Sequence, residues 1–223
     1  MRAALLLLLL LAACSRPLSA PEKGFLHQLT GDAIDVSRIR VVPSLATVTR
    51  TTPVPPRITC VSRLFPPDPR KMASGASPAM TLWNTILIRS DWHAPSMAGP
   101  WPGVLDLTRA LILAHEALHV WQWQQRARTR YTPFRAFGEH FAKADPYLFD
   151  PDSTAEFSQF GFEQQGAIFE EYLCCRLLAP KADRTKRLHA MISRELPLSP
   201  IGTPLAEQIL LPWNGVKIEG ICG

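Results

Sequence analysis

The sequence predicts a single α+β domain that is mainly helical and has a small β-sheet in its N-terminal part. Its 223 residues, 47% of them hydrophobic, are enough to bury one good core. Strand-like stretches occur before residue 90, whereas long apolar stretches of helix-favouring residues follow residue 104. No internal repeat is visible in the sequence. We therefore expect one folded domain over residues 25–223.

Strands are predicted at residues 35–42, 57–65 and 81–89. Eleven of the 21 prolines lie between Pro43 and Pro102, and proline fixes φ and removes a hydrogen-bond donor. This portion therefore cannot be long helix or central sheet throughout. The stretch 81–89 is rich in β-branched residues and precedes the first long helical segment. It is predicted either as a plain core strand or as an edge strand that pairs with an extended peptide.

Helices are predicted mainly in the second half of the chain. Pro133 stands where the first turn of a helix tolerates proline, and Pro180 closes a later helical stretch. Turn-forming residues fill positions 145–154. The tail after Pro197 contains further prolines and is expected to wrap the surface. The segments predicted as helix, or as helix or turn for the first, are 25–29, 105–128, 133–144, 155–178 and 181–195.

The first residues predict export from the cytoplasm. Arg2 is followed by a run of seven leucines that is too short to span a membrane well. The sequence Leu11-Ala-Ala-Cys14 then resembles a bacterial lipobox. On this interpretation residues 1–13 are a lipoprotein signal peptide, Cys14 is lipidated, and residues 14–24 are a tether.

The residue after the cysteine bears on localisation. Ser15, rather than aspartate, follows Cys14, which resembles Gram-negative lipoproteins of the outer membrane. We therefore expect the protein in the cell envelope, anchored in the outer membrane by its lipid and facing the periplasm. The alternative is an ordinary signal peptide that is cleaved later, for example after Ala20.

Four further cysteines are expected to form disulfides in an oxidising compartment. Adjacent cysteines rarely bond each other, so Cys174 and Cys175 would each pair with Cys60 or Cys222. The alternative is that the adjacent pair forms a metal or redox site.

The overall charge argues against some classes of partner. Charged residues make up 19% of the chain, and the formal net charge is +5. The composition is not that of a disordered chain, and the charge is too small to argue for nucleic acid. The basic residues at 126–130 are expected to complement the C-terminal end of a helix dipole.

The stretch His115-Glu-Ala-Leu-His119 is an H-E-x-x-H pattern inside an apolar, helix-favouring run. Residues four apart share one face of a helix, so both imidazoles can reach a single ion, with Glu116 beside it. This arrangement is typical of zinc hydrolases, in which a carboxylate takes a proton from metal-bound water. The alternative is two ordinary histidines on a partly buried helix, which would need other hydrogen-bond partners. We therefore predict Zn²⁺ as cofactor, His115 and His119 as ligands and Glu116 as general base.

A catalytic zinc site usually has three protein ligands. A third histidine close behind the motif is absent, because the positions three and six residues after His119 are Gln122 and Gln125. The other common solution is a glutamate on a later helix.

The segment 155–178 offers three such glutamates. At about 100° per residue, Glu163 and Glu170 share one face, whereas Glu171 lies about 80° from Glu163. Small residues at Gly166 and Ala167 would allow close approach to the motif helix. We assign Glu163 as the third ligand and Glu170 as an acceptor that orients a ligand imidazole. The reverse assignment of these two glutamates remains open.

The remaining histidines have no spacing that predicts a site. We expect them on the surface or in the core with their hydrogen bonds satisfied; they are His27, His93, His140 and His189. A zinc hydrolase often also has a tyrosine or histidine that donates to the developing oxyanion. The candidates for that role, among which the sequence does not select, are Tyr131, Tyr147, His140 and His189.

The order of motifs carries a resemblance over about residues 30–175. Gly31-Asp-Ala-Ile-Asp35, a strand, His115-Glu-Ala-Leu-His-Val-Trp-Gln122 and Glu163-Gln-Gln-Gly-Ala-Ile168 follow one another. This order resembles the zincin-type metallopeptidase domains of bacterial Vgr-related and contractile-injection proteins. The resemblance implies a zincin-like fold with a gluzincin-like site, in which Glu163 is the third ligand. The lipobox, the proline-rich region and the paired cysteines depart from that family and argue against a role in a secretion machine.

Together these features predict a membrane-tethered, zinc-dependent metallopeptidase that hydrolyses a peptide or protein substrate. The alternative is a non-catalytic envelope lipoprotein with a structural or vestigial zinc site, acting in assembly or partner binding. Its interaction surface would then include Trp101, Trp121 and Trp123. A structural zinc is normally closed by four protein ligands, and no fourth ligand is apparent in the sequence, which favours the enzyme.

Overall fold

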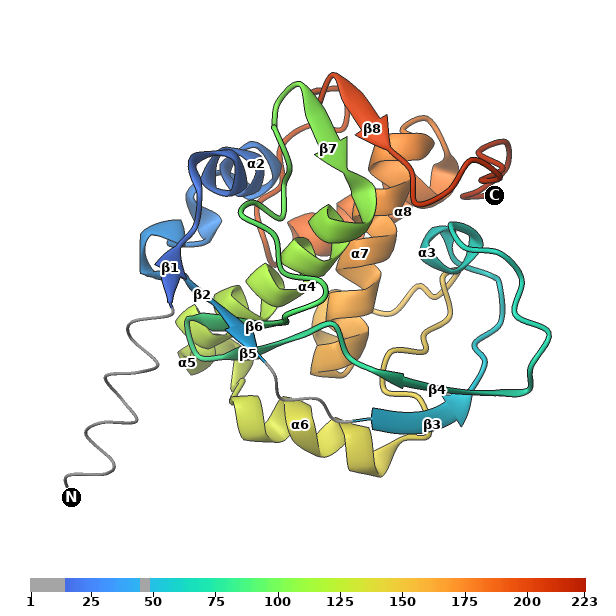
Figure 1. Cartoon of the computed structure of the whole chain (residues 1–223), viewed down its shortest axis with the longest axis horizontal. Helices are drawn as coiled ribbons and strands as arrows, with labels where there is room; N and C mark the ends of the chain where they lie inside the picture. Colours follow the sequence, from blue (N-terminus) through green and yellow to red (C-terminus); the bar gives the residue numbers. More distant parts are fainter. Residues whose placement is uncertain (1–14, 45–48) are drawn as a thin grey trace.

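Two helices cross at the centre of the fold (Figure 1). The structure is a computed structural model that describes residues 15–44 and 49–223. The central helices are α4 (Leu107–Gln124) and α7 (Phe162–Leu178), and small sheets lie around them. The predicted α+β class is confirmed. The proposed signal peptide and lipidation site, residues 1–14, lie outside the described residues.

A four-stranded sheet lies against α4. Its order is β1-β2-β6-β5, with β2 and β6 parallel and the other neighbours antiparallel. The strands are β1 (Arg16–Pro17), β2 (Arg40–Ser44), β5 (Ala79–Leu82) and β6 (Thr85–Arg89). The predicted strand at 35–42 therefore begins late, because Val36–Arg38 form a 3₁₀ turn capped by the Asp35 carboxylate.

Two smaller sheets complete the β-structure. Strands β3 (Thr49–Pro53) and β4 (Met72–Ala76) form an antiparallel pair. Strands β7 (Val104–Asp106) and β8 (Gln208–Leu210) form a parallel pair. The C-terminal tail thus reaches back to the residues that precede α4.

The prediction of a tether over residues 14–24 is wrong from Arg16 onward. Arg16 and Pro17 pair with β2, and helix α2 (Ala20–Thr30) begins at a capping box between Ser19 and Glu22. Leu18 is buried in the core, and the buried Glu22 carboxylate binds the Arg16 guanidinium at 2.7 Å. These contacts make the segment part of the fold.

The strand predicted at 57–65 is also wrong. Residues Cys60–Arg63 form a short helix, α3, whose first turn is capped reciprocally by Thr59 and Ser62. This capping pattern is a local signal for the start of a helix. The sequence-based prediction gave more weight to the β-branched residues of the segment. The helix is also fixed from outside, because Glu171 accepts a hydrogen bond from the Val61 amide at 3.3 Å.

The stretch predicted as one strand at 81–89 is a hairpin. Trp83, at a φ of 57°, turns the chain between β5 and β6. Strand β6 lies inside the sheet, whereas β5 forms its edge. The edge-strand and core-strand predictions therefore each fit one half of the hairpin.

Predicted and observed helices differ mostly at their ends. Helix α4 begins after β7, where the Asp106 carboxylate caps the Arg109 amide, and a short α5 (Arg126–Thr129) follows it. Helix α6 (Pro133–Ala142) begins at the predicted proline. Helix α7 starts at residue 162 rather than 155, and α8 (Asp183–Ser193) ends the helical part. Within residues 15–44 and 49–223, no helix is long and apolar enough to cross a membrane.

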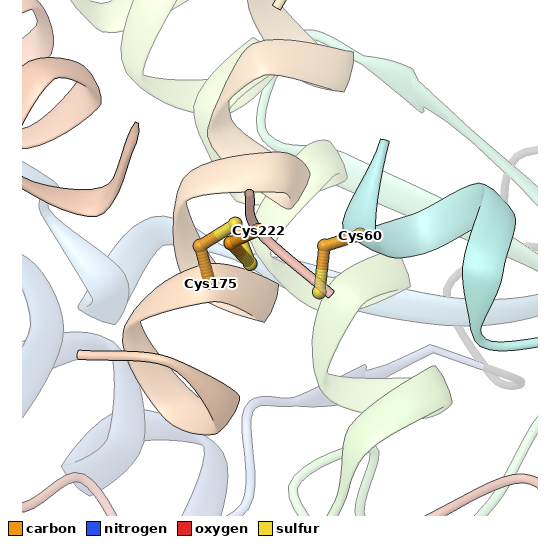
Figure 2. A group of neighbouring side chains, drawn as sticks. All are labelled: Cys60, Cys175 and Cys222. Atoms are coloured by element: carbon orange, nitrogen blue, oxygen red, sulfur yellow. A yellow bond between two sulfur atoms is a disulfide. The ribbon is translucent and has the colours of Figure 1, made fainter. Parts of the chain in front are cut away.

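Two disulfides join α7 to distant parts of the chain. They link Cys60 to Cys174 and Cys175 to Cys222, which confirms the predicted pattern. Figure 2 shows the second bridge with Cys60 close by. One hydrophobic cluster runs from Leu18 to Cys222 and includes these cysteines.

Candidate metal centre

The candidate centre lies where α4 and α7 approach each other closely. A Cβ atom at Gly166 would lie 2.4 Å from His115 Cε1, so only glycine permits this contact. His115, Glu116 and His119 are all buried on α4, and Glu163 is buried on α7. Gly166, which was predicted to allow close approach to the motif helix, is thus in direct contact with that helix.

Three side chains converge on one point. The Nε2 atoms of His115 and His119 lie 3.1 Å apart. Glu163 Oε2 lies 3.3 Å from the first and 3.4 Å from the second. An ion with tetrahedral ligands at about 2.0–2.1 Å has ligand–ligand edges of about 3.3 Å. The described residues therefore contain a three-ligand group with the dimensions of a metal site.

A chain of amides fixes the orientation of His119. The Phe160 carbonyl can only accept, so Gln165 turns its amide nitrogen toward it at 2.8 Å. Gln165 Oε1 then accepts from Gln122 Nε2 at 2.9 Å, and Gln122 Oε1 accepts from His119 Nδ1 at 2.7 Å. The proton of neutral His119 is therefore on Nδ1, and the Nε2 lone pair faces His115 and Glu163. Gln122 and Gln165 were not assigned any role from the sequence.

Glu170 acts on the other imidazole. Its Oε1 accepts from His115 Nδ1 at 2.5 Å, which leaves His115 Nε2 directed at Glu163 and His119. Glu163 Oε2 thus lies among the converging atoms, and Glu170 lies behind the His115 ring.

The electrostatics of the cluster favour a cation. Burial alone would lower the pKa of His115, but the carboxylates of Glu170 and Glu163 outweigh it and raise that pKa well above its usual value. Burial alone would raise the pKa of Glu163, but His119 and His115 hold it well below its usual value. Lone pairs and a carboxylate crowded together in this way are stabilised by a proton or by a metal ion.

Glu116 lies beside the cluster and is held by the edge strand. Thr81 on β5 donates its hydroxyl to Glu116 Oε2 at 2.7 Å and lies 3.1 Å from the Glu116 carbonyl. Burial raises the pKa of Glu116, and the nearby His115 and His119 oppose this. A buried carboxylate with a raised pKa has the character of a proton acceptor for neutral conditions.

Helix α6 supports Glu163 from the side opposite α4. Glu139 accepts hydrogen bonds from the Phe162 and Glu163 amides at 2.8 and 3.1 Å and so caps the N-terminus of α7. His140 Nε2 lies 3.3 Å from Glu163 Oε1. His140 was expected on the surface or in the core, or as one of four candidate oxyanion donors, and Glu139 was not singled out. Neither residue has a local spacing that links it to residue 163.

Besides His140, two other candidate oxyanion donors belong to the centre. The Tyr131 ring stacks on His119 with centroids 5.5 Å apart, and the Tyr147 ring lies 5.8 Å from His115. The Tyr147 hydroxyl is 3.3 Å from Ser77 Oγ. Burial, reinforced by nearby carboxylates, raises the pKa of both tyrosines, so each keeps its proton and remains a donor.

The other histidines lie elsewhere. His189 Nδ1 is 2.8 Å from the Tyr172 hydroxyl, and His27 pairs with Asp32 at the surface. This removes His189 as an oxyanion candidate.

A second cluster with metal-ligand atoms is not a metal site. Cys60, Cys175 and Cys222 lie within 4.8 Å of one another (Figure 2). All three sulfur atoms are in disulfides, so no thiolate is available to bind an ion. The alternative of a metal or redox site at the adjacent cysteines is therefore not supported.

No protein-family model and no curated protein matches the chain. Among solved structures, the chain is similar to the effector domain of Pseudomonas aeruginosa VgrG2b, with 17% sequence identity and a TM-score of 0.48. The match covers 80% of this chain and 82% of that chain. A likeness at this level defines no activity, which must follow from the residues of the centre.

Proposed function

We propose that this protein is a zinc-dependent metallopeptidase, with His115, His119 and Glu163 as zinc ligands and Glu116 as general base. The observation that carries the proposal is the triangle of ligand atoms, 3.1–3.4 Å on each side, beside a buried carboxylate. Two imidazoles and one carboxylate are a donor set typical of catalytic zinc. A structural zinc is normally closed by four protein ligands, and the group found among the described residues has three.

The chain's own groups divide the work of peptide hydrolysis. Zinc, when bound, polarises the substrate carbonyl and lowers the pKa of its water toward neutrality. Glu116, fixed by the Thr81 hydroxyl, accepts the proton of the attacking water and passes it to the leaving amine. Tyr131, Tyr147 and His140, which lie next to His119, His115 and Glu163 respectively, are donors available for the developing oxyanion.

Strand β5 supports a peptide as substrate. It forms the edge of the four-stranded sheet, and its Thr81 holds the general base. An extended peptide can add to such an edge by backbone hydrogen bonds, which would bring its carbonyls alongside Glu116. In this proposal the lipobox at Cys14 anchors the enzyme in the outer membrane, and the two disulfides fit a periplasmic location.

The decisive experiment replaces the base and leaves the ligands. Glu116→Gln should retain one zinc per chain and lower the hydrolysis rate of unfolded protein substrates by about 10²–10⁴-fold, because the amide keeps the Thr81 hydrogen bond but accepts no proton. His115→Ala should lose both zinc and activity. Glu207→Gln, at an exposed site on the tail, is the matched control. Full activity in Glu116→Gln would refute the mechanism. If the wild-type protein binds zinc but hydrolyses no substrate, a non-catalytic envelope lipoprotein would be favoured.

A further inference from the structure

The outer face of α6 presents three phenylalanines to solvent. Phe134, Phe137 and Phe141 are 75%, 44% and 74% exposed. At about 100° per residue they fall in a stripe only about 60° wide. Ala136 and Glu139 lie on the opposite side, toward α7. An exposed aromatic stripe of this kind marks an interaction surface.

The chain segment that contains this stripe is predominantly basic. Between residues 125 and 144 Glu139 is the only acidic residue, and its carboxylate is engaged by two amides of α7. The Arg50 guanidinium lies 5.5 Å from the centre of the Phe141 ring. The exposed basic residues of this segment are Arg126, Arg128, Arg130, Arg135 and Lys143, of which Arg128 is paired with Glu195 at 2.8 Å. The surface therefore combines an apolar stripe with positive charge, which complements an anionic lipid surface.

The start of the folded chain indicates how such a surface would be presented. In Figure 1, α6 lies along the lower edge of the molecule, and α5 lies between it and β1 in the same view. Arg40 donates to the Ser15 carbonyl at 2.7 Å, so the fold begins directly after Cys14. A lipid on Cys14 would thus hold the folded body against the bilayer without a flexible spacer.

We propose that the stripe Phe134–Phe137–Phe141 and its flanking basic residues dock on a bilayer surface that carries anionic headgroups. The phenyl rings enter the boundary between headgroups and acyl chains, and the guanidinium groups bind lipid phosphates. Since the inner face of the same helix carries Glu139 and His140, docking brings the candidate metal centre close to the membrane surface. Substrates at that surface would then be the ones within reach.

The test uses residues 15–223, which contain the whole core and both disulfides and lack the apolar leader. We would measure co-sedimentation with vesicles of phosphatidylcholine alone and of phosphatidylcholine with phosphatidylglycerol. The expected result is binding to the anionic vesicles that weakens in high salt. The double variant Phe134→Ser/Phe141→Ser should bind at least about tenfold more weakly.

Further variants separate the membrane from other occupants. Arg126→Gln/Arg130→Gln should weaken binding to anionic vesicles only, whereas Leu210→Ser, which removes a 56% exposed side chain from β8, should change nothing. Thermal unfolding checks that each variant is folded. The proposal is overturned by absent vesicle binding or by equal binding of all variants. It is also overturned if sedimentation equilibrium shows a dimer that the phenylalanine substitutions convert to monomer. The same holds if these substitutions raise KM for peptides without affecting vesicle binding.

Discussion

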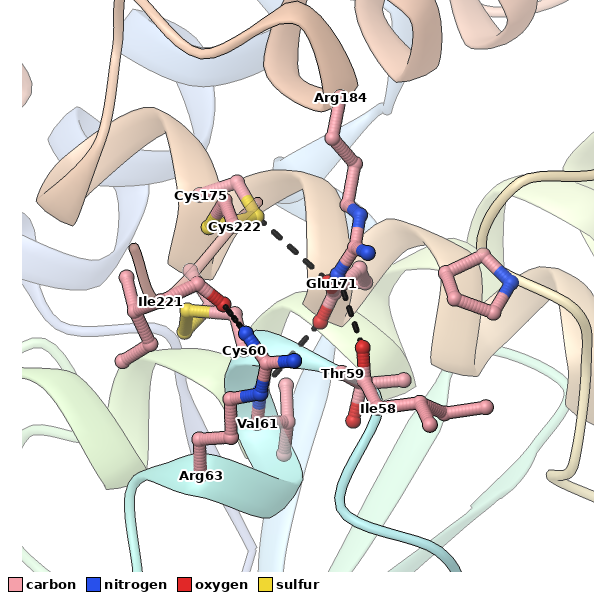
Figure 3. Close-up of polar contacts among 12 residues, drawn as sticks. Ile58, Thr59, Cys60, Val61, Arg63, Glu171, Cys175, Arg184, Ile221 and Cys222 are labelled. Carbon is pink, nitrogen blue, oxygen red and sulfur yellow. Dashed lines mark hydrogen bonds and ion pairs between the residues drawn. A yellow bond between two sulfur atoms is a disulfide. The ribbon is translucent and has the colours of Figure 1, made fainter. Parts of the chain in front are cut away.

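The two halves of α7 use buried carboxylates in opposite ways. In the N-terminal half, Glu163 and Glu170 face the histidines of α4. Glu170 accepts from His115 Nδ1, and Glu163 Oε2 converges with the Nε2 atoms of His115 and His119. In the C-terminal half, the buried Glu171 carboxylate pairs with Arg184 at 3.1 Å and with the Val61 amide (Figure 3). The carboxylates of the first half thus face imidazoles, which can exchange a proton for a metal ion, whereas the carboxylate of the second half is neutralised by an arginine.

The disulfides reinforce the same division. Cys174 and Cys175 lie in the C-terminal half itself and tie it to α3 and to the C-terminal tail. Arg63 of α3 also donates to the Ile221 carbonyl at 3.1 Å (Figure 3). A rigid half of the helix can hold the ligand-bearing half in place. The comparison predicts that substitutions in the N-terminal half of α7 weaken metal binding, whereas substitutions in the C-terminal half lower the free energy of unfolding.

The largest expected effect is on metal binding in the N-terminal half. Glu163→Ala removes one of three ligand atoms and should weaken zinc binding by at least about a thousandfold, measured by competition with a chelator. Glu207→Ala, at an exposed position, should bind one zinc per chain like the wild type. If Glu163→Ala keeps full affinity, Glu170 would be the ligand and the assignment of the two glutamates would have to be exchanged.

The next effect concerns the ion pair of the C-terminal half. Arg184→Met strands the Glu171 carboxylate in the core and should lower the free energy of unfolding by about 3–5 kcal/mol at neutral pH. Burial already raises the pKa of Glu171 despite Arg184, and the variant should raise it further. The folded state then binds the proton more tightly than the unfolded state, so the variant should regain stability as the pH falls through that raised pKa.

A second substitution checks the origin of that loss. Arg184→Met/Glu171→Gln removes the stranded charge and should recover much of the stability, as urea unfolding at several pH values would show. Zinc stoichiometry should remain unchanged in both variants. A stability loss that does not depend on pH would mean that packing of the arginine side chain, not charge, accounts for it.

Loss of one disulfide should have a somewhat smaller effect. Cys175→Ser/Cys222→Ser opens a bridge between residues 47 apart and should lower the free energy of unfolding by about 2–4 kcal/mol. Urea unfolding with and without a thiol reductant measures this, and the reductant should destabilise the variant further through the Cys60–Cys174 bridge. The folded variant should still bind one zinc. Zinc loss from the folded variant would show that the two halves of α7 are not independent.

The features of the site that could be predicted are those between residues close together in sequence. Helical periodicity places His115 and His119 on one face of α4, and separates Glu163 and Glu170 from Glu171, because these relations lie within single helices. The contact of His140 with Glu163 depends on how α6 packs on α7, which no local pattern encodes. For the same reason, the hydrogen bond from Thr81 to Glu116, the proposed general base, could not be predicted.

The errors in the fold prediction have related causes. Residues 57–65 were assigned by their composition as a strand, although the chain forms α3, which tertiary contacts with Glu171 and Cys174 hold in place. Residues 16–24 resemble a tether in composition, yet Glu22 is buried against Arg16 and the Met97 amide. In both segments a local capping box begins the helix, and partners more than 70 residues away in sequence, at Glu171 and Met97, hold it in place.

The smallest expected effect tests how far the proposed metal site depends on hydrogen bonds behind the proposed ligands. Glu170→Gln keeps an acceptor for His115 Nδ1 but removes its negative charge, and should weaken zinc binding by about 10–100-fold without loss of stoichiometry. The measurement is zinc competition alongside urea unfolding of the metal-free protein, with Glu171→Gln as the neighbouring control. Since Glu171 faces Arg184, that control should leave zinc affinity unchanged. If both variants weaken zinc equally, the effect comes from the net charge of α7, and the contact between Glu170 and His115 has no specific role.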